Sequence, residues 1–590
     1  MKSKVKTKNG NPCICIGEQQ FPACAYVTYF EERNDYAEFT KHGFRMYSVS
    51  VSLASQPINT QSGLNFGGGV FDQKGRADFS YVDQSISMIL RACPDAYIFP
   101  RIYVTMPQWW IEEHPTETTE VPHGKRREML FSDCFRHDAA QMLKELIEHF
   151  RTFFASDRVF GYQISGGNTQ EWFHLDLNGS LTQNALPYFN RFLEREYGES
   201  TSKLPELSEA KGDGIITDTL LKKYVRFANK EVAKTIELLC EVAKKASCFE
   251  QIVGVFYGYT AEVVDGLWGT HALYDIIDSP SIDFFSSPNS YTNGRSLGVD
   301  WGDMMPVDSI KLHNKMCFIE SDIRTFLTRT PEESRKGSDP QRYYTAELWQ
   351  GPPTEEMSVY AVRKSLARQL THGHGLWWFD MFGHWYSTDN LMKEMKTSHE
   401  LYCYALDTQS DDFDTEVALF LDEKAYSEVG AFSEAASMPY KIRALLGYCG
   451  VPYHVYLTED FDKVIQEKNY KAVVFCRPLL SKEAKKMCEK LNEKGIASYC
   501  IHSQTKLPSV AELKAFFKKS NVFVYCDSED VFYIGNGFVA IHTQNGGKKE
   551  LSFPKKIKIT DVNTKKCHIT DHLTVDMKDC ETLLFHFSFV

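Results

Sequence analysis

The chain lacks the local motifs that mark several large classes of protein. Its 16 cysteines are scattered along 590 residues, and no CxxC pair suggests a zinc site. No run approaches the roughly 18 apolar residues of a membrane span, and the basic start of the chain lacks the apolar segment of a signal peptide. No glycine-rich phosphate-binding motif is present. We therefore expect a cytoplasmic protein with reduced thiols, without a metal, a cofactor or a membrane partner.

The charge balance and the aromatic content narrow the range of partners. A net charge of −12 and a pI near 5.9 argue against nucleic acid or an anionic membrane as the main partner. Aromatic residues make up 13% of the chain, which is high. This content suits a sugar-binding enzyme, but a large aromatic core would have the same composition.

Short apolar runs alternate with helical patterns from residue 21 to about residue 398. This alternation is typical of βα units. Helices are expected over 36–42, 81–92 and 218–246, and after an N-cap at 132–133. The eight runs that we interpret as strands cover 24–30, 46–51, 96–104, 158–165, 251–259, 281–286, 315–322 and 375–382.

Eight strands with intervening helices predict an α/β fold, a (β/α)8 TIM barrel with insertions. Polar and aromatic residues gather after strands three to eight, where such barrels carry their chemistry. The glycine- and asparagine-rich excursion over 56–76 either closes over this face or contacts a neighbouring subunit.

Beyond residue 410 the pattern changes to a second, smaller alternation of strands and helices. Strands are expected over 415–421, 452–457, 470–476 and 497–501, with helices over 439–447 and 481–494. From about residue 530 only strands are expected. The sequence thus predicts a barrel over 1–408, a flavodoxin-like α/β domain over 409–528 and a small antiparallel β domain over 529–590.

Two glutamates stand just past the ends of predicted strands. Glu171 follows the fourth strand and Glu320 ends the seventh, and these two strands face each other across the mouth of a barrel. Cleaving a glycosidic bond with retention requires two carboxyl groups about 5 Å apart. We assign Glu320 as nucleophile and Glu171 as acid/base; the alternative is that each is an ordinary surface or salt-bridged glutamate.

Several polar residues near strand ends are candidates for substrate binding. Asp322 and Arg324 follow the nucleophile and either hold it ionised or form a structural ion pair at the rim. Arg101, in the third strand, either orients the nucleophile or binds a sugar hydroxyl, with a structural role as the alternative. Tyr291, after the sixth strand, is placed to touch the nucleophile with its phenol.

Four tryptophans and two polar residues complete the candidate set. Some of the indoles are expected to stack on sugar rings and the others to lie in the core. Asp380 and His384, at the eighth strand, are candidates for binding sugar hydroxyls, with a buried structural role as the alternative. The four tryptophans are Trp110, Trp172, Trp378 and Trp385.

Residues 132–165 resemble the helix and fourth strand of the β-galactosidases of glycoside hydrolase family 42. The segment 96–115 and the Trp-Trp-Phe-Asp run of strand eight (377–380) are similar too, as is the order of domains. The resemblance implies a retaining exo-β-glycosidase, with β-galactosides as the first substrates to test. It also implies a homotrimer in which the second domain serves assembly.

The loop after the fourth strand departs from the pattern of that family. The family has an Asn-Glu pair there, in which Asn binds the 2-hydroxyl, whereas this chain reads Ser-Gly-Gly-Asn-Thr-Gln-Glu over 165–171. Asn168 or Gln170 is the candidate replacement for the missing amide. A β-mannosidase or another β-glycosidase of the same clan, or a non-catalytic sugar-binding barrel, therefore remains an alternative. The four-cysteine zinc cluster of the family has no counterpart.

Overall fold

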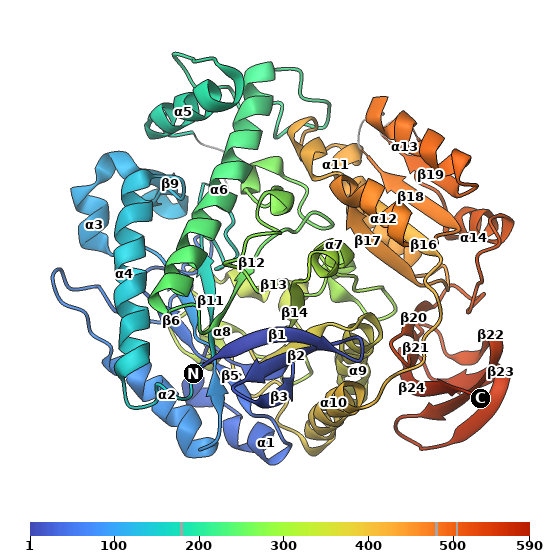
Figure 1. Ribbon diagram of the computed structural model, residues 1–590. Helices are drawn as coiled ribbons and strands as arrows, with labels where there is room; N and C mark the ends of the chain where they lie inside the picture. The colour runs from blue at the N-terminus through green and yellow to red at the C-terminus, as the bar shows by residue number, and fades with distance from the viewer. Residues whose placement is uncertain (177–180, 478–481, 503–504) are drawn as a thin grey trace.

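The fold is seen in a computed structural model that describes residues 1–176, 181–477, 482–502 and 505–590. Short parallel strands close into a barrel, with helices packed around its outside (Figure 1). The sheet order is β6-β8-β11-β12-β13-β14-β15-β4-β5-β7. The ten strands are β4 (Cys24–Val27), β5 (Met46–Ser48), β6 (Ser50–Ser52), β7 (Tyr97–Ile98), β8 (Arg101–Val104), β11 (Gly161–Gly166), β12 (Ile252–Phe256), β13 (Phe284–Ser286), β14 (Met316–Ser321) and β15 (Gly375–Phe379).

The second and third predicted strands of the barrel are each broken into two shorter strands. β5 pairs with β4 and β7, while β6, which follows one residue later, pairs with β8. The breaks turn eight predicted strands into ten observed ones without changing their order. The (β/α)8 barrel predicted from the sequence is therefore confirmed.

Amphipathic helices cover the barrel where the sequence predicts them. α4 begins after the N-cap Ser132, whose hydroxyl accepts from the backbone N–H of Phe135 at 3.1 Å. α6 begins in the same way after Asp218. The helices of this part are α1 (Tyr36–Lys41), α2 (Ser80–Ala92), α3 (Gln108–Glu113), α4 (Asp133–Thr152), α5 (Leu186–Tyr197), α6 (Thr219–Ala246), α7 (Val307–Leu312), α8 (Pro331–Ser334), α9 (Glu355–His372) and α10 (Asp389–Asp407).

Two small antiparallel sheets were not anticipated. β1 (Ser3–Lys8), β2 (Asn11–Ile16) and β3 (Gln19–Pro22) form a sheet at the amino-terminal ends of the barrel strands, where Ser3 N–H donates to Glu250 O at 2.7 Å. A hairpin of β9 (Thr118–Val121) and β10 (Lys125–Glu128) lies between α3 and α4.

A second α/β unit follows the barrel. Its four parallel strands have the order β17-β16-β18-β19, which matches the first four strands of a flavodoxin-like sheet. α11 begins at Glu434, five residues before the helix expected at Pro439, because Ser433 caps it and the proline sits inside. Of the predicted helix over 481–494, residue 481 lies outside the described residues. The elements are β16 (Val417–Leu421), α11 (Glu434–Leu446), β17 (Tyr453–Leu457), α12 (Phe461–Glu467), β18 (Ala472–Cys476), α13 (Lys482–Glu493), β19 (Ala497–Ile501) and α14 (Val510–Lys519).

The chain ends in a five-stranded antiparallel sheet. Its order is β20-β21-β24-β22-β23. Its first two strands pack against α9, so that Val531 and Phe538 belong to the core of the barrel part. The strands are β20 (Val531–Gly535), β21 (Phe538–His542), β22 (Gly547–Asp561), β23 (Cys567–Met577) and β24 (Thr582–Phe589). Among the helices described, none combines the length and the apolarity needed to cross a membrane.

The close approach of β12 to β13 gives a test of barrel packing. Gly254 pairs in register with Phe284, and a Cβ at Gly254 would lie 2.0 Å from the phenyl ring. We expect Gly254→Ala to destabilise the barrel by about 1–3 kcal/mol, because the ring has to leave its position. Thermal unfolding followed by circular dichroism measures the shift. Gly214→Ala is the matched control, since a Cβ there meets nothing within 4 Å; equal melting curves for the two variants would contradict the expectation.

Candidate active site

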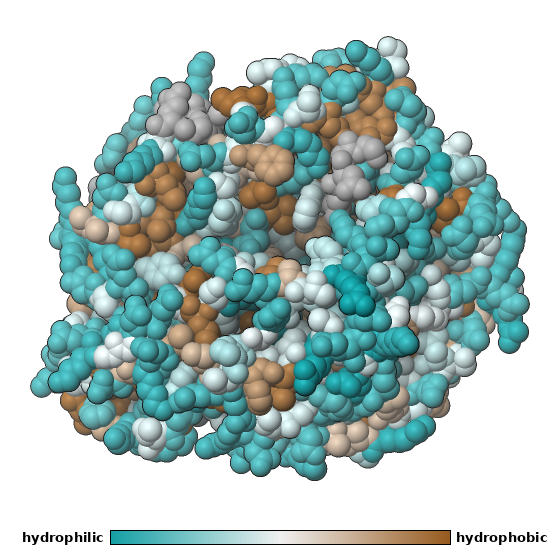
Figure 2. All heavy atoms as spheres, turned by 180° about the vertical axis from the view of Figure 1, so that it is seen from behind, coloured by the Kyte–Doolittle hydropathy of each residue, from teal (hydrophilic) through white to brown (hydrophobic). Residues whose placement is uncertain are grey.

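A cavity of about 380 Å³ opens where the barrel strands end, and it contains both predicted catalytic glutamates. The face of the molecule opposite to that of Figure 1 is hollowed near its centre (Figure 2). Three of the predicted site residues besides the glutamates also line this cavity. The predicted residues that line it are Arg101, Asn168, Glu171, Tyr291 and Glu320.

Glu320 is held deep in the cavity by the barrel itself. It is the penultimate residue of β14, its side chain is 6% exposed, and its backbone N–H donates to Ser287 O at 2.9 Å. Arg101 Nη1 lies 3.4 Å from Glu320 Oε2. The guanidinium is itself enclosed by aromatic rings, with Phe256 4.4 Å away. A buried cation thus contacts the carboxyl group predicted to be the nucleophile.

Glu171 reaches the cavity from a tightly wound loop after β11. Thr169, Gln170 and Trp172 all have left-handed backbone angles, with φ of 57°, 67° and 61°. The Trp172 ring packs on Gly166, where a Cβ would lie 2.6 Å from the ring, so the glycine is required for this packing. The buried indole fixes the loop that carries the carboxyl group.

The carboxyl group of Glu171 accepts hydrogen bonds from two neutral hydroxyl groups. Thr169 Oγ1 donates to Glu171 Oε2 at 2.5 Å, and Tyr259 OH donates to Glu171 Oε1 at 2.8 Å. Burial raises its pKa, and the hydrogen bonds from Thr169 and Tyr259 only partly oppose this rise. A raised pKa is the property that an acid/base glutamate needs.

The two glutamates and Asp322 share one electrostatic environment. Burial raises the pKa of Glu320 well above its usual range, Arg101 opposes that rise, and Asp322 and Glu171 add to it. Neighbouring carboxyl groups in a buried site resist ionising together, so the pair tends to retain a proton. Arg101 acts to lower the pKa of both glutamates, and it contacts Glu320 directly.

Asp322 lies behind the cavity wall and stays charged. Burial raises its pKa, but Arg295 and Arg324 overcome this effect and the net shift is downward. Arg295 Nη1 lies 2.5 Å from Oδ1, and Arg324 Nη1 lies 3.0 Å from Oδ2. Tyr291 OH donates to Asp322 Oδ2 at 2.7 Å. The phenol of Tyr291, expected at the nucleophile oxygen, therefore binds the carboxylate two residues further on.

The amides of Asn168 and Gln170, predicted to bind the sugar 2-hydroxyl, are bonded to other parts of the protein. Asn168 lines the cavity, but its Oδ1 accepts from Thr60 N–H at 2.8 Å and its Nδ2 donates to Gln61 Oε1 at 3.0 Å. Gln170 is buried, and its Oε1 accepts from Tyr29 OH at 3.2 Å. The loop over 56–76 thus lies against the site, where Asn59 and Gln61 bring amide groups to the cavity.

None of the four candidate tryptophans is among the described residues that line the cavity. Trp172 packs under the Glu171 loop, and Trp385 is buried beside Arg324. On β15, Trp378 donates to Ser398 of α10 at 3.0 Å, whereas its neighbour Phe379 lines the cavity. Adjacent strand residues point to opposite sides, and the sequence did not show which side faces inward.

Trp110 belongs to a separate polar group between α3 and α4. Its indole N–H donates to Asp138 Oδ2 at 2.7 Å. His114, Cys134 and Asp138 have ligand atoms within 4.8 Å of one another, and they form the metal-capable group found among the described residues. Burial raises the pKa of the Cys134 thiol to about 11, with Asp138 adding to the effect.

Asp380 and His384 organise the turn after β15. Asp380 is buried and accepts from Tyr26 OH at 2.8 Å and from the backbone N–H groups of His384 and Trp385. The His384 ring lies 3.1 Å from Asp35. Neither residue is among the described residues that line the cavity. Their contacts fit the structural role that was the alternative to binding sugar hydroxyls.

Much of the cavity wall is aromatic and was not anticipated. Most of these rings come from long loops after β12 and β14, and such loops carry no periodic pattern. The sequence features that could have indicated this wall are the adjacent tyrosines at 343 and 344 and the tryptophan at 349. The aromatic residues concerned are Tyr29, Phe173, Tyr259, Trp268, Tyr343, Tyr344, Trp349 and Phe379.

The fold is a barrel whose cavity contains two buried carboxyl groups, and the comparisons agree with the fold. No protein-family model matches the chain, and no curated protein matches it by sequence. A crystal structure of a β-galactosidase from Bacillus circulans sp. alkalophilus is 12% identical over 96% of this chain and 99% of that one, with a TM-score of 0.62. A cold-adapted β-galactosidase from Rahnella sp. R3 is 11% identical over 98% and 100%, also with a TM-score of 0.62.

A third similar structure is named for a different substrate. The apo exo-carrageenase of glycoside hydrolase family 42 from Bacteroides ovatus is 11% identical over 100% of this chain and 85% of that one, with a TM-score of 0.59. At these identities the likeness shows the fold. The predicted resemblance to glycoside hydrolase family 42 is confirmed at that level, as that of a divergent relative.

The hydrogen bond from Tyr259 gives a prediction for the pKa of Glu171. That bond lowers the pKa, so Tyr259→Phe is expected to raise it further above the usual range of a glutamate. Infrared difference spectra of the protonated carboxyl band against pH, with Glu171→Gln as reference, measure the change. Tyr257→Phe is the control, because its hydroxyl donates to the carbonyls of Gly269 and Asn229. A pKa that falls or stays constant in Tyr259→Phe would rule out the assigned contact.

Proposed function

We propose that the protein is a retaining exo-β-glycosidase, with β-galactosides as the first substrates to test. The observation that carries the proposal is the pair Glu171 and Glu320, buried in one cavity with different partners. One carboxyl group contacts a guanidinium, and the other accepts from two hydroxyls. This is the asymmetry that a double-displacement mechanism requires.

The proposed reaction has two steps. Glu320, ionised beside Arg101, attacks the anomeric carbon, while Glu171 gives its proton to the leaving oxygen. Glu171 then takes a proton from water, which attacks the anomeric carbon and releases Glu320. The aromatic wall supplies faces on which a sugar ring can stack, and the Asn59 and Gln61 amides offer partners for hydroxyls.

The identity of the sugar is proposed from the names of the similar structures and from the loop after β11. The similar structures are named β-galactosidases and an exo-carrageenase, which favours a galactose-type ring. A β-mannosidase is the second candidate, because no Asn precedes Glu171 and the Asn168 amide is occupied by residues of the 56–76 loop. The same departure supports the non-catalytic sugar-binding alternative. The cytoplasmic location and the homotrimer stay predictions.

A panel of aryl β-glycosides tests the enzyme proposal. We expect hydrolysis of the galacto substrate to exceed that of the gluco, manno, fuco and xylo substrates, measured as released phenolate. A manno preference would select the second candidate. No turnover of any sugar, combined with sugar binding seen by tryptophan fluorescence, would leave a binding protein and sink the enzyme proposal.

The two glutamates are distinguished by their variants. Glu320→Ala is expected to lose about 10⁴-fold or more in kcat and to regain part of it with azide, which fills the vacated space and attacks in its place. Glu171→Ala is expected to spare aryl substrates with good leaving groups, because these depart without protonation. Glu262→Ala removes another carboxyl group that lines the cavity, and it is expected to raise KM without any rescue of kcat by azide. Equal losses in both catalytic variants without azide rescue would refute the assigned roles.

A further inference from the structure

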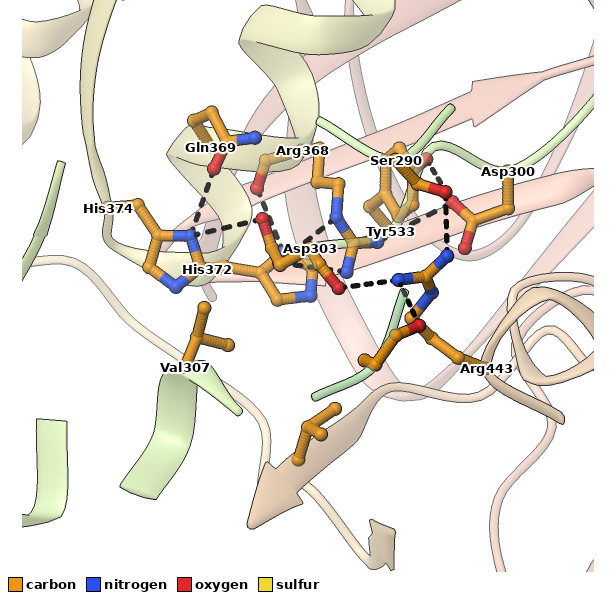
Figure 3. Close-up of polar contacts among 12 residues, drawn as sticks. Ser290, Asp300, Asp303, Val307, Arg368, Gln369, His372, His374, Arg443 and Tyr533 are labelled. Carbon is orange, nitrogen blue, oxygen red and sulfur yellow. Dashed lines mark hydrogen bonds and ion pairs between the residues drawn. The ribbon is translucent and has the colours of Figure 1, made fainter. Parts of the chain in front are cut away.

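An arginine of the second α/β unit ends directly behind the wall of the barrel cavity. Arg443 lies on α11 and its side chain is 1% exposed. Figure 3 shows its guanidinium directed toward Ser290 and the backbone of Asp303, beside the ion pair of Arg368 with the Asp303 carboxylate. A charged side chain buried this completely is stable only with several partners.

The guanidinium joins three segments from two barrel loops at once. Nη1 donates to Ala261 O at 3.0 Å and to Asp303 O at 2.8 Å. Nη2 donates to Glu262 Oε2 at 2.7 Å and to Ser290 Oγ at 2.6 Å. Ala261 and Glu262 follow β12, and Ser290 and Asp303 lie near the two ends of the connection from β13 to α7. A planar fork with fixed donors suits this arrangement.

The three segments are also bonded to one another around the arginine. Ala261 N–H donates to Met304 O and Ser290 N–H donates to Gly302 O, both at 2.9 Å. A Cβ at Gly302 would lie 2.7 Å from Arg443 Nε, so only glycine lets the side chain pass this close. The contact between the two units is therefore shaped for this arginine.

Each loop that Arg443 binds supplies a residue to the cavity. Glu262, Tyr291 and Met304 all line it. Glu262 Oε1 accepts from the Tyr291 backbone N–H at 2.9 Å, and Ser290 Oγ donates to Glu262 Oε2 at 2.8 Å. The Tyr291 phenol in turn binds Asp322, whose charge acts on Glu320. A continuous set of contacts leads from α11 to the substrate-facing wall.

We propose that Arg443 is a positioning residue of the site: it fixes the Glu262 carboxylate and the Tyr291 ring where substrate binds. The second α/β unit thereby completes the binding wall of the barrel. This inference rests on the proposed glycosidase function. Neither Glu262 nor Tyr291 is a reacting group, so loss of Arg443 acts on substrate binding more than on the chemical steps.

Kinetics of Arg443→Met and Arg443→Lys on the best aryl glycoside test the role. For Arg443→Met we expect a fall in kcat/KM of about 10- to 100-fold, mainly through a higher KM, because the wall residues shift by a fraction of an ångström or more. Arg443→Lys keeps the charge but not the fork, and is expected to recover part of the loss. Tyr291→Phe combined with Arg443→Met is expected to lose less than the product of the single losses.

Arg363→Met is the matched control for the loss of a buried arginine between units. Arg363 pairs with Glu394 at 2.7 Å and donates to Thr582 O at 3.1 Å, so it joins α9 to β24 without contacting the cavity wall. Its loss is expected to lower thermal stability and to leave KM and kcat within about twofold. Equal kinetic constants in Arg363→Met and Arg443→Met would overturn the proposal.

Hydrogen–deuterium exchange separates this proposal from the proposed function, because it needs no turnover. In Arg443→Met and Arg443→Lys, peptides covering 259–265 and 288–291 are expected to exchange faster than in the wild type. The same peptides in Arg363→Met are expected to be unchanged. Unchanged exchange in both Arg443 variants would overturn the inference even in an active enzyme. Faster exchange in a protein without turnover would support it while the enzyme proposal fails.

Discussion

The structure depends on charge compensation among buried groups at the mouth of the barrel. Glu171, Glu320 and Asp322 share one electrostatic environment, and burial acts to raise the pKa of each carboxyl group. Isolated buried charges are too costly to keep, so arginines accompany them: Arg101 at Glu320, and Arg295 with Arg324 at Asp322. Glu171 instead accepts from the hydroxyls of Thr169 and Tyr259, and burial raises its pKa.

The loop after β11 shows how the fold accommodates this chemistry with an altered sequence. Left-handed residues are uncommon and cost free energy, yet Thr169, Gln170 and Trp172 adopt this conformation in one turn. A buried indole packed on Gly166 and hydroxyl bonds to the carboxyl group hold the turn in place. The cost is offset by packing, and Glu171 reaches the cavity that also contains Glu320.

The site also depends on parts of the chain outside the barrel strands. The loop over 56–76 occupies the Asn168 amide, and aromatic rings from the loop after β14 form one wall. Arg443 brings the second α/β unit to the back of another wall. The fold is shared with β-galactosidases at about 10–12% identity.

The sequence by itself determined the barrel, the order of its strands and the positions of Glu171 and Glu320 at strand ends, because apolar periodicity and chain order are local properties. Only the tertiary structure decided that Phe379 rather than Trp378 faces the cavity, since alternation along a strand does not say which side is inward. The same holds for Asn168, whose partners come from a loop far away in the chain. Side-chain partners are set by packing between distant segments, which no local pattern records.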